Sequence, residues 1–356
     1  MRVLIDVGHP AHVHYYKNLA FKLKEQGHFV LFTCRDKDVA LDLLAQYSLK
    51  HIVIGKPFKG VIKKIIGVFI FDVKLFYLIR KYKIEVVFSA GSFYAAHAAF
   101  LNFIPHFTLE DSENFEQIRL YRPFSKLIIT PKYIVNLGKK QLKVNGFLQN
   151  SYLKDNYFNP DEKILDRYNF QKNKPTLLFR FVAHNATHDI GLEKLSVVGK
   201  TELIKKYENK ANIIISSETP LPQDLSKYKI KFQASEMHSV IYKIDLLIAE
   251  SGAMTNESAF LGTPNIVIVD KDLNVHKEYE RLGLKYHIKK YGSDLESKID
   301  EILSNYKEVK INMRERSRNF QSNSIDLTEF LMWIALNHKE KDFKNKLINN
   351  FQPHVQ

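Results

Sequence analysis

Short apolar runs alternate with longer amphipathic stretches from the start of the chain. Residues 3–7 (VLIDV) form an apolar run, and residues 8–10 (GHP) interrupt it. Apolar side chains then recur at helical spacing over residues 13–26, and a second apolar run follows at residues 29–33. A strand, a helix and a strand this close together predict a βαβ unit, in which the two strands are parallel.

The same alternation continues along the chain and predicts two sheets. Further strands are predicted at residues 51–54, 85–89, 106–109, 126–130, 176–180, 211–215, 229–232, 246–249 and 265–269. Residues 156–175 interrupt the pattern with a polar segment that contains two prolines, which is typical of a linker. The predicted fold class is therefore α/β, with two doubly wound Rossmann-like domains.

We place the first domain at residues 1–160, the second at 174–320, and at 321–340 a C-terminal helix that packs back on the first domain. Residues from 338 onward are polar and are predicted to fray. Ligands of open parallel sheets bind at the carboxyl ends of the strands. Two such domains facing each other would form a cleft at those ends.

Composition and charge narrow the choice of function without deciding it. The chain has 356 residues, of which 45% are hydrophobic. Cys34 is the single cysteine, which excludes an intrachain disulfide and a cysteine-based zinc site. The formal net charge of +14 favours polyanionic surroundings, namely nucleic acid, an anionic membrane or phosphorylated substrates.

The most apolar stretch, residues 65–79, is shorter than the about 20 apolar residues that a membrane-spanning helix needs. The opening residues lack the apolar length of a signal peptide, so we expect a cytoplasmic protein. Residues 56–83 mix basic side chains with Ile, Phe and Val. This pattern predicts either a helix that touches the inner face of an anionic membrane, or a core helix with solvated lysines.

The most specific motif follows the strand that ends at residue 249. Ser251 and Gly252 form a predicted tight turn, and a helix is predicted over residues 253–262. The N–H groups at such a helix start bind anions, with help from the helix dipole. Glu257 could accept hydrogen bonds from the two hydroxyls of a ribose. A phosphate at the turn and a ribose at the carboxylate together indicate a nucleotide; the alternative is an ordinary turn with a solvated Glu257.

This motif resembles the donor-site signature of GT-B glycosyltransferases of the MurG type and of UDP-N-acetylglucosamine 2-epimerases. The matching positions are Ser251, Gly252, Glu257, Gly262 and Pro264. The segments DVGHPAHVHYYKNL, FTCRDKD, RFVAHNATHDIG and ISSETPLP are similar to the GT-B-like family called DUF354, over nearly the whole chain. The resemblance implies a GT-B fold, a metal-independent site without a cofactor, and a nucleotide-sugar substrate, with UDP favoured.

On this resemblance, the second domain binds the donor and the first domain faces the acceptor. The implied phosphate contacts at the helix start also include Ala253, Met254 and Thr255. The loop after residue 180 is implied to contact the diphosphate. The other donor-binding candidates lie at or just after the ends of the strands predicted at residues 176–180 and 211–215. They are Arg180, His184, Asn185 and Ser217. The guanidinium of Arg180 can pair with phosphate. For Ser217 the alternative is a plain turn before Pro220.

Three imidazoles, those of His9, His12 and His14, follow the first strand. No carboxylate accompanies them at ligand spacing, so we expect no metal site. His12 would lie at a helix N-terminus, where the dipole lowers an imidazole pKa and favours a neutral base. The alternative is helix capping and packing by His9 and His14.

A run of carboxylates over residues 110–114 (EDSEN) follows the strand at residues 106–109. Asp111 and Glu113 are the candidates for a base that takes a proton from an acceptor hydroxyl. In an epimerase the same group would remove or return a proton on the sugar. The alternative is a helix cap, with Asp111 or Ser112 in that position.

Three functions follow from these observations. The first is a glycosyltransferase that uses a nucleotide sugar to build a cell-surface polysaccharide, such as a capsule, or a glycolipid, on a glycan or lipid-linked acceptor. The second is a UDP-sugar 2-epimerase-like isomerase, although the opening motif of that family has no close copy here. The third is a non-enzymatic basic nucleic-acid-binding protein, although the lysines are dispersed and no specific nucleic-acid motif is present.

Overall fold

The apolar runs of the chain pair into two parallel sheets, which confirms the α/β prediction. The computed structural model describes residues 1–36, 38–56, 61–182, 197–230 and 232–356. These residues divide into two compact units. The first unit contains Met1–Tyr157 and Ser324–Gln356, and the second contains Phe158–Asn323. The polar segment expected as a linker thus carries one boundary between the units.

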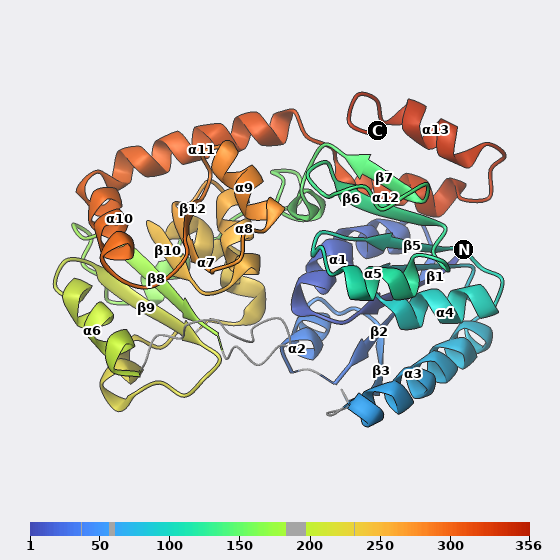
Figure 1. Ribbon diagram of the computed structural model, residues 1–356, viewed down its shortest axis with the longest axis horizontal. Helices are drawn as coiled ribbons and strands as arrows, with labels where there is room; N and C mark the ends of the chain where they lie inside the picture. The colour runs from blue at the N-terminus through green and yellow to red at the C-terminus, as the bar shows by residue number, and fades with distance from the viewer. Residues whose placement is uncertain (37, 57–60, 183–196, 231) are drawn as a thin grey trace. The chain divides into compact units, whose positions relative to one another are not determined.

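The first unit is built on a 7-stranded parallel sheet with the order β3-β2-β1-β4-β5-β6-β7 (Figure 1). Its strands are β1 (Arg2–Val7), β2 (Phe29–Arg35), β3 (His51–Gly55), β4 (Val86–Ala90), β5 (His106–Leu109), β6 (Leu127–Pro131) and β7 (Gln141–Val144). The predicted strands of this region are all present. Strand β7 was missed, because its sequence QLKV is short and half polar.

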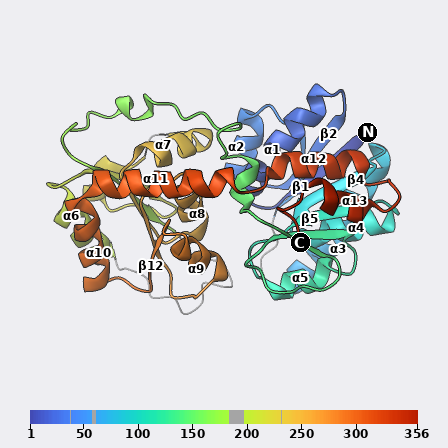
Figure 2. The same cartoon turned by 90° about the horizontal axis from the view of Figure 1, so that it is seen from above.

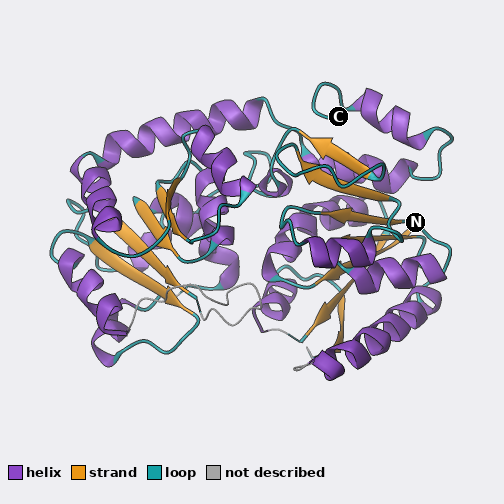
Figure 3. Cartoon of the chain, in the orientation of Figure 1, coloured by secondary structure: helices purple, strands orange, loops and turns teal. Residues whose placement is uncertain are grey.

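Helices lie on both faces of this sheet (Figure 3). They are α1 (Pro10–Glu25), α2 (Asp38–Gln46), α3 (Val61–Lys81), α4 (Phe93–Leu101), α5 (Phe115–Tyr121), the 3-10 turn η1 (Leu148–Ser151), α12 (Leu327–Asn337) and α13 (Phe343–Asn350). Helix α3 packs on α4, whereas α1 packs on α12 and η1. The apolar helix near the C-terminus therefore belongs to the first unit.

The last residues of the chain do not fray, so that prediction is wrong. Helix α13 lies beside α12 (Figure 2), and its Leu347 is fully buried. Beyond it, the backbones of Lys143 and Gln356 exchange two hydrogen bonds of 2.9 Å, and the N–H of Asn145 donates to the carbonyl of His354 at 2.7 Å. A few buried apolar side chains and the edge of β7 thus order a segment whose composition is polar.

The second unit is built on a 5-stranded parallel sheet with the order β12-β11-β10-β8-β9. Its strands are β8 (Thr176–Phe181), β9 (Asn212–Ser217), β10 (Leu246–Ala249), β11 (Asn265–Ile268) and β12 (Tyr286–Ile288). Its helices are α6 (Val197–Tyr207), α7 (Met237–Lys243), α8 (Gly252–Phe260), α9 (Asn274–Arg281), α10 (Ser293–Ser304) and α11 (Tyr306–Ser322), with 3-10 turns η2 (Ile164–Arg167), η4 (Gln223–Tyr228) and η5 (Ala234–Glu236).

Residue 231 of the strand predicted at residues 229–232 lies outside the described residues, and the other three residues form no strand, so this prediction is wrong for them. Lys229 forms only an isolated bridge with Ile215, directly after the 3-10 turn η4. The segment KIKF alternates polar and apolar residues, whereas the buried strands of this parallel sheet are nearly continuous apolar runs. Conversely, β12 was missed because its sequence YHI is short and only half-buried.

Candidate functional site

Each sheet has one place where successive connections leave in opposite directions. In the second unit, β8 is followed by β9 on one side, and the chain then returns to β10 on the other side. In the first unit, the same reversal lies between β1 and β4. The loops after the two strands diverge at such a point and leave a crevice, which is where open parallel sheets bind ligands.

In the second unit, the Ser251–Gly252 bend lies at this reversal. Strand β10 ends at Ala249, Ser251 is extended with φ −116°, and α8 begins at Gly252, one residue earlier than predicted. The Ser251 side chain does not cap the helix, and its first turn contains no acidic residue. The N–H groups of this turn are therefore not neutralised locally, which is the condition for an anion site.

The three residues that follow have different surroundings. Ala253 is exposed and Met254 is half-buried, so both backbones lie near the surface of the bend. Thr255 is fully buried, and its hydroxyl donates to the carbonyl of Gly252 at 3.0 Å. Thr255 therefore stabilises the backbone of the bend from its buried side. Its predicted part in binding the donor stays a prediction.

Glu257 is not a solvated helix residue, so that alternative is wrong. Its residue exposure is 7%, and its Oε1 lies 3.1 Å from Nε2 of His238, near the start of α7. His238 is itself buried, at 3% exposure. The carboxylate is thus held in one orientation by an imidazole of the same unit, which is a suitable basis for recognising a hydroxyl pair.

Arg180 occupies the end of β8, but its guanidinium already has a carboxylate partner. Its Nη2 donates to Glu218, and its Nη1 donates to the hydroxyl of Ser216 at 2.9 Å. Its Nε is buried, and no residue in the described ranges accepts a hydrogen bond from it. Sequence reasoning expected this side chain to pair with phosphate, and that role would require it to share or leave Glu218.

The structure gives less support to the other donor-binding candidates, His184, Asn185 and Ser217. His184 and Asn185 lie outside the described residues. Ser217 is half-buried at the end of β9, and its hydroxyl donates to the carbonyl of Thr219 at 2.8 Å. The N–H of Thr219 returns a bond of 3.2 Å to that hydroxyl. Ser217 therefore closes a local turn, as the alternative interpretation had it.

Glu250, one residue before the bend, was not selected from the sequence. It is buried, and its Oε2 accepts from the N–H of Val182 at 2.8 Å, while its Oε1 accepts from the hydroxyl of Tyr291 at 2.7 Å. Burial and the nearby carboxylate of Glu250 raise the pKa of Tyr291. Glu250 thus joins the loops after β8 and β10, and keeps the two sides of the crevice in register.

Two further residues missed from the sequence lie beneath α8. Lys285 is buried, and its Nζ donates to Asn256 and to the hydroxyl of Thr255, the latter at 3.1 Å. It also lies 3.3 Å from Nδ1 of His276, which is 1% exposed. Lysine is rarely buried, and a lysine inside the segment GLKYHI was the available signal.

In the first unit, the reversal between β1 and β4 carries the histidine loop. His9 caps α1, because its Nδ1 accepts from the N–H of Ala11 at 3.2 Å, and His14 is buried with its ring 5.4 Å from that of Tyr152. These two residues behave as the packing alternative predicts. Nδ1 of His12 accepts from the N–H of Gly8 at 3.3 Å. A neutral His12 then carries its proton on Nε2 and acts there as a donor rather than a base.

Arg35 lies against Gly8 at the same edge of the sheet. A side chain on Gly8 would place its Cβ 1.7 Å from Nη2 of Arg35, so glycine is required for this approach. The guanidinium carbon of Arg35 also lies 5.4 Å from the ring centroid of Tyr94, at the start of α4. Nothing in the sequence pattern indicated Arg35 as a site residue.

The carboxylate run after β5 separates into one structural and one titratable group. Glu110 is buried and accepts bonds of 2.6 Å from the N–H and hydroxyl of Ser112 and from the hydroxyl of Tyr121. Asp111 is half-buried, and burial together with the charge of Glu110 raises its pKa to about 7. A carboxyl with such a pKa can exchange protons near neutral pH.

Glu113 and the helix cap complete this loop. Glu113 has a left-handed backbone with φ +53°, which is a turn conformation. Asn114 caps α5, since its Oδ1 accepts from the N–H of Gln117 at 3.3 Å. The expectation that Asp111 or Ser112 is the cap is therefore wrong. This leaves the Asp111 carboxyl outside the cap, and favours Asp111 over Glu113 as the proton acceptor.

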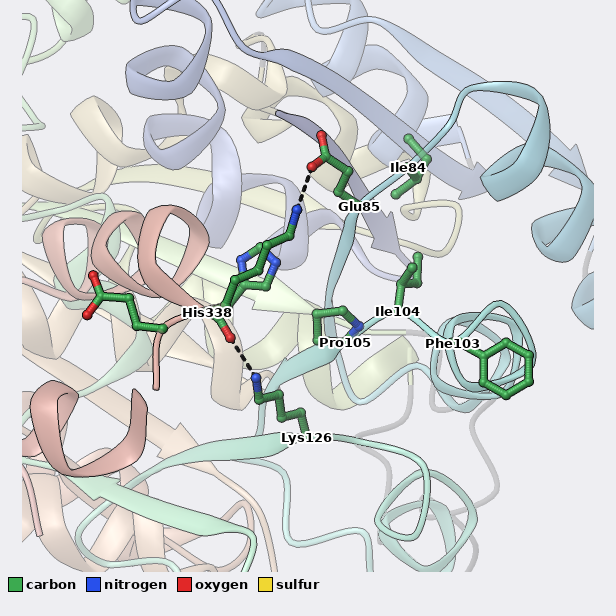
Figure 4. A pocket seen from close by; sticks show the side chains of 9 residues that line it. Ile84, Glu85, Phe103, Ile104, Pro105, Lys126 and His338 are labelled. Carbon is green, nitrogen blue, oxygen red and sulfur yellow. Dashed lines mark hydrogen bonds and ion pairs between the residues drawn. The ribbon is translucent and has the colours of Figure 1, made fainter. Parts of the chain in front are cut away.

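The opposite edge of the first sheet carries a hollow of about 500 Å³ (Figure 4). It is lined by Ile84, Glu85, Phe103, Ile104, Pro105, Lys126, His338, Lys339 and Glu340. Its walls are tied by bonds from Lys339 to Glu85 at 2.8 Å and from Lys126 to the carbonyl of His338 at 2.7 Å. Six of these residues directly precede β4, β5 and β6, and the other three follow α12. The hollow therefore lies at the amino ends of these strands, away from their carboxyl ends, and we do not assign the site to it.

In the described part of the chain, no group of three or more His, Cys, Asp or Glu side chains is arranged to hold a metal ion. In the same residues, no helix has the length and apolar character needed to cross a bilayer.

The chain is similar to several solved structures over almost its whole length. The UDP-GlcNAc 2-epimerase from Neisseria meningitidis, bound to UDP-GlcNAc, is 15% identical with a TM-score of 0.63, covering 95% of this chain and 100% of that chain. The S. aureus MnaA–UDP structure is 13% identical with a TM-score of 0.69, covering 98% of each chain. The glycosyltransferase VinC in complex with dTDP is 11% identical with a TM-score of 0.60, covering 94% and 99%. At these identities the likeness shows the fold alone.

Among curated proteins, the chain is 26% identical over 292 residues to the uncharacterised protein MJ0665 of Methanocaldococcus jannaschii, covering 76% of this chain and 82% of that protein. A family model described as "Protein of unknown function (DUF354)" matches residues 1–332. The chain therefore belongs to the DUF354 family, and it has the fold shared by GT-B glycosyltransferases and UDP-GlcNAc 2-epimerases.

Proposed function

We propose that this protein is a metal-independent glycosyltransferase that uses a nucleotide sugar in the synthesis of a cell-surface polysaccharide or glycolipid. The observation that carries the proposal is the Ser251–Gly252 bend at the reversal point of the second sheet, with α8 uncapped and Glu257 in the same helix. A helix start of this kind suits a diphosphate, and a fixed carboxylate in the same helix suits the ribose.

The reaction follows from these groups. The acceptor hydroxyl oxygen bonds to the anomeric carbon of the sugar, and the bond from that carbon to the diphosphate oxygen breaks. The diphosphate leaves as an anion, which the N–H groups of the α8 start stabilise without a metal. Asp111, in the first unit, takes the proton of the acceptor hydroxyl. We rank Asp111 above His12 and Glu113 for this role.

UDP is the nucleotide we favour, with dTDP second. The support is the fold shared with two proteins whose structures contain UDP or UDP-GlcNAc and with one that contains dTDP. The test is calorimetry with UDP, dTDP, GDP and CMP, each with and without EDTA. One preferred diphosphate, bound equally in EDTA, supports the proposal; binding that EDTA abolishes would contradict the metal-free mechanism, and no nucleotide binding would contradict the donor site.

The acceptor side includes a proposed contact with an anionic membrane, through the outer face of α3. This face exposes Phe69, Val73 and Tyr77, at 67, 53 and 64%, and the helix ends on Arg80 and Lys81. An apolar stripe with a basic end suits an anionic lipid surface, such as the inner face of the cytoplasmic membrane. The test is sedimentation with phosphatidylglycerol vesicles, with phosphatidylcholine vesicles as the control. Equal binding to both, or none, would contradict the contact.

A UDP-sugar 2-epimerase-like activity is the second candidate, favoured by the raised pKa of Asp111, because such a group can both remove and return a proton. The two activities separate in D₂O. An epimerase incorporates deuterium into UDP-GlcNAc without an acceptor, whereas a glycosyltransferase leaves the sugar unlabelled. Binding of duplex DNA with a steep salt dependence, and of no nucleotide, would instead support the nucleic-acid alternative.

A further inference from the structure

We propose that His276 is a further phosphate-binding residue at the Ser251–Gly252 bend, and that the buried Lys285 positions its ring so that Nε2 donates to the ligand. The inference rests on the proposed function, since it concerns the same donor diphosphate. It adds a side-chain donor to a site that the motif assigns to backbone N–H groups. Lys285 acts through His276 and is a positioning residue.

The first observation is the close approach of the ring to the bend. A Cβ built on Gly252 would lie 3.2 Å from Cε1 and 3.5 Å from Nε2 of His276. The edge of the imidazole that carries Nε2 therefore faces the first residue of α8. Glycine at position 252 leaves room for this edge, which therefore lies against the residue at which α8 begins.

The second observation is the hydrogen-bonding state of the ring. Nζ of Lys285 lies 3.3 Å from Nδ1 of His276, and it also donates to Thr255 and Asn256. When Lys285 is protonated, as it would be beside a bound anion, its Nζ has only donors. Nδ1 is then the acceptor, and the neutral ring carries its proton on Nε2. His276 is 1% exposed, and within the described ranges no protein group accepts a hydrogen bond from Nε2.

The third observation is the charge balance around Lys285. Its hydrogen-bond partners, Thr255, Asn256 and His276, are all neutral. The carboxylate of Glu280 acts on it electrostatically, but no ion pair joins Lys285 to a carboxylate among the described residues. Burial lowers the pKa of Lys285 well below its usual value, and burial with the adjacent Lys285 lowers the pKa of His276 to about 2. A buried cation without a counter-charge is costly, and an anion at the bend would supply that charge.

The test uses two substitutions at position 276 in the full chain. His276→Leu removes the donor, whereas His276→Gln keeps an N–H donor on a side chain of similar reach. The probes are inorganic pyrophosphate, the preferred nucleoside diphosphate and its nucleoside. We expect His276→Leu to weaken pyrophosphate and the nucleoside diphosphate about tenfold, to leave the nucleoside unchanged, and His276→Gln to recover most of the loss.

A separate measurement, the tautomer of the His276 ring, tests whether Lys285 positions it. In ¹⁵N spectra of the wild-type protein, His276 should be the Nε2–H tautomer, identified by the loss of its signals in His276→Gln. Lys285→Met, which preserves volume, should shift the ring toward a mixture of tautomers and weaken pyrophosphate. If Lys285→Met does not fold, the tautomer of the wild-type ring still decides, because an Nδ1–H form would overturn the inference.

The outcomes separate this inference from the proposed function. One outcome is that the nucleoside diphosphate binds and that Glu257→Gln lowers its affinity, while His276→Leu leaves the affinities for pyrophosphate and the nucleoside diphosphate unchanged. In that case the inference is wrong and the proposed function stands. If pyrophosphate binds and His276→Leu weakens it, but no nucleoside diphosphate binds, the inference stands and the function is wrong. If neither probe binds the wild-type protein, both are wrong.

Discussion

The reversal points of the two sheets share a topology but differ in the chemistry beneath their loops. In the first unit, Ser89, His106 and Thr108 form a buried neutral network, with Nε2 of His106 2.8 Å from the hydroxyl of Ser89, and burial lowers the pKa of His106 to about 3. In the second unit, the basic groups near the loops are the buried Lys285 and the half-buried Arg180. The first edge can therefore exchange a proton at Asp111, and the second can hold an anion.

The comparison shows how one scaffold supports two tasks. Parallel strands bring loop ends together at a reversal point, whatever the sequence. Whether that point handles a proton or a phosphate depends on the side chains immediately below the loops, which set the local charge and pKa values.

The largest expected effect is on turnover in Asp111→Asn. Loss of a general base should reduce the rate about 10²- to 10⁴-fold, and donor affinity measured by calorimetry should be unchanged. In the wild-type protein the rate should rise with pH and level off above about 7, as the Asp111 carboxyl loses its proton. Glu113→Gln is the control; equal losses in both variants would contradict the assignment.

Asp111→Asn should lower turnover but raise stability above neutral pH. The folded pKa of the Asp111 carboxyl, about 7, is above the usual 3.8, so the native state binds the proton more tightly than the unfolded chain. This stabilising contribution is complete below about pH 4 and is lost as the pH rises through about 7. Asp111→Asn should therefore melt at a higher temperature than the wild-type protein at pH 8, with little difference at pH 4.

The next effect is structural and lies in the second unit. Gly262 follows α8 with φ +69°, and a Cβ there would lie 2.6 Å from Cα of Arg314 in α11. Gly262→Ala must displace backbone, so we expect a loss of about 2–4 kcal/mol in the free energy of unfolding. Thermal melts measure it. An unchanged melting temperature would show that α8 is not fixed by α11.

Glu257→Gln should weaken the nucleoside diphosphate about 10- to 100-fold, because it removes a charged acceptor. It keeps the volume of the side chain beside His238, so the melting temperature should fall only slightly. Ser217→Ala is the control, since that hydroxyl serves its own turn. Unchanged binding in Glu257→Gln would remove this residue from the site.

The smallest effect is expected for Gly252→Ala. The added Cβ would come within 3.2 Å of the His276 ring, which must then move by a few tenths of an ångström. We expect pyrophosphate affinity to fall about 3- to 10-fold. The double variant Gly252→Ala/His276→Leu should bind pyrophosphate as tightly as His276→Leu alone. If the two losses of affinity add instead, positions 252 and 276 are not in contact.

Local patterns were enough to predict most strands and the Ser251–Gly252 bend, because buried parallel strands are apolar runs and helix starts follow glycine turns. They could not reveal that Arg180 is paired with Glu218, that Glu257 is held by His238, or that Lys285 lies under α8. These contacts join residues that are 19 to 38 positions apart in the sequence. Strand β7 and the chain end are hydrogen-bonded to each other, so the local sequence of either segment was not enough to predict its structure.

The pairing of residues 354–356 with β7 has a practical consequence. β7 is the outermost strand of its sheet, and the chain end occupies its open backbone groups through Gln356 and His354. Shortening the chain before residue 351 would leave a bare strand that can pair with a strand of another molecule. Tags and fusions are therefore better joined to Met1, and a shortened protein should be checked for self-association before its activity is interpreted.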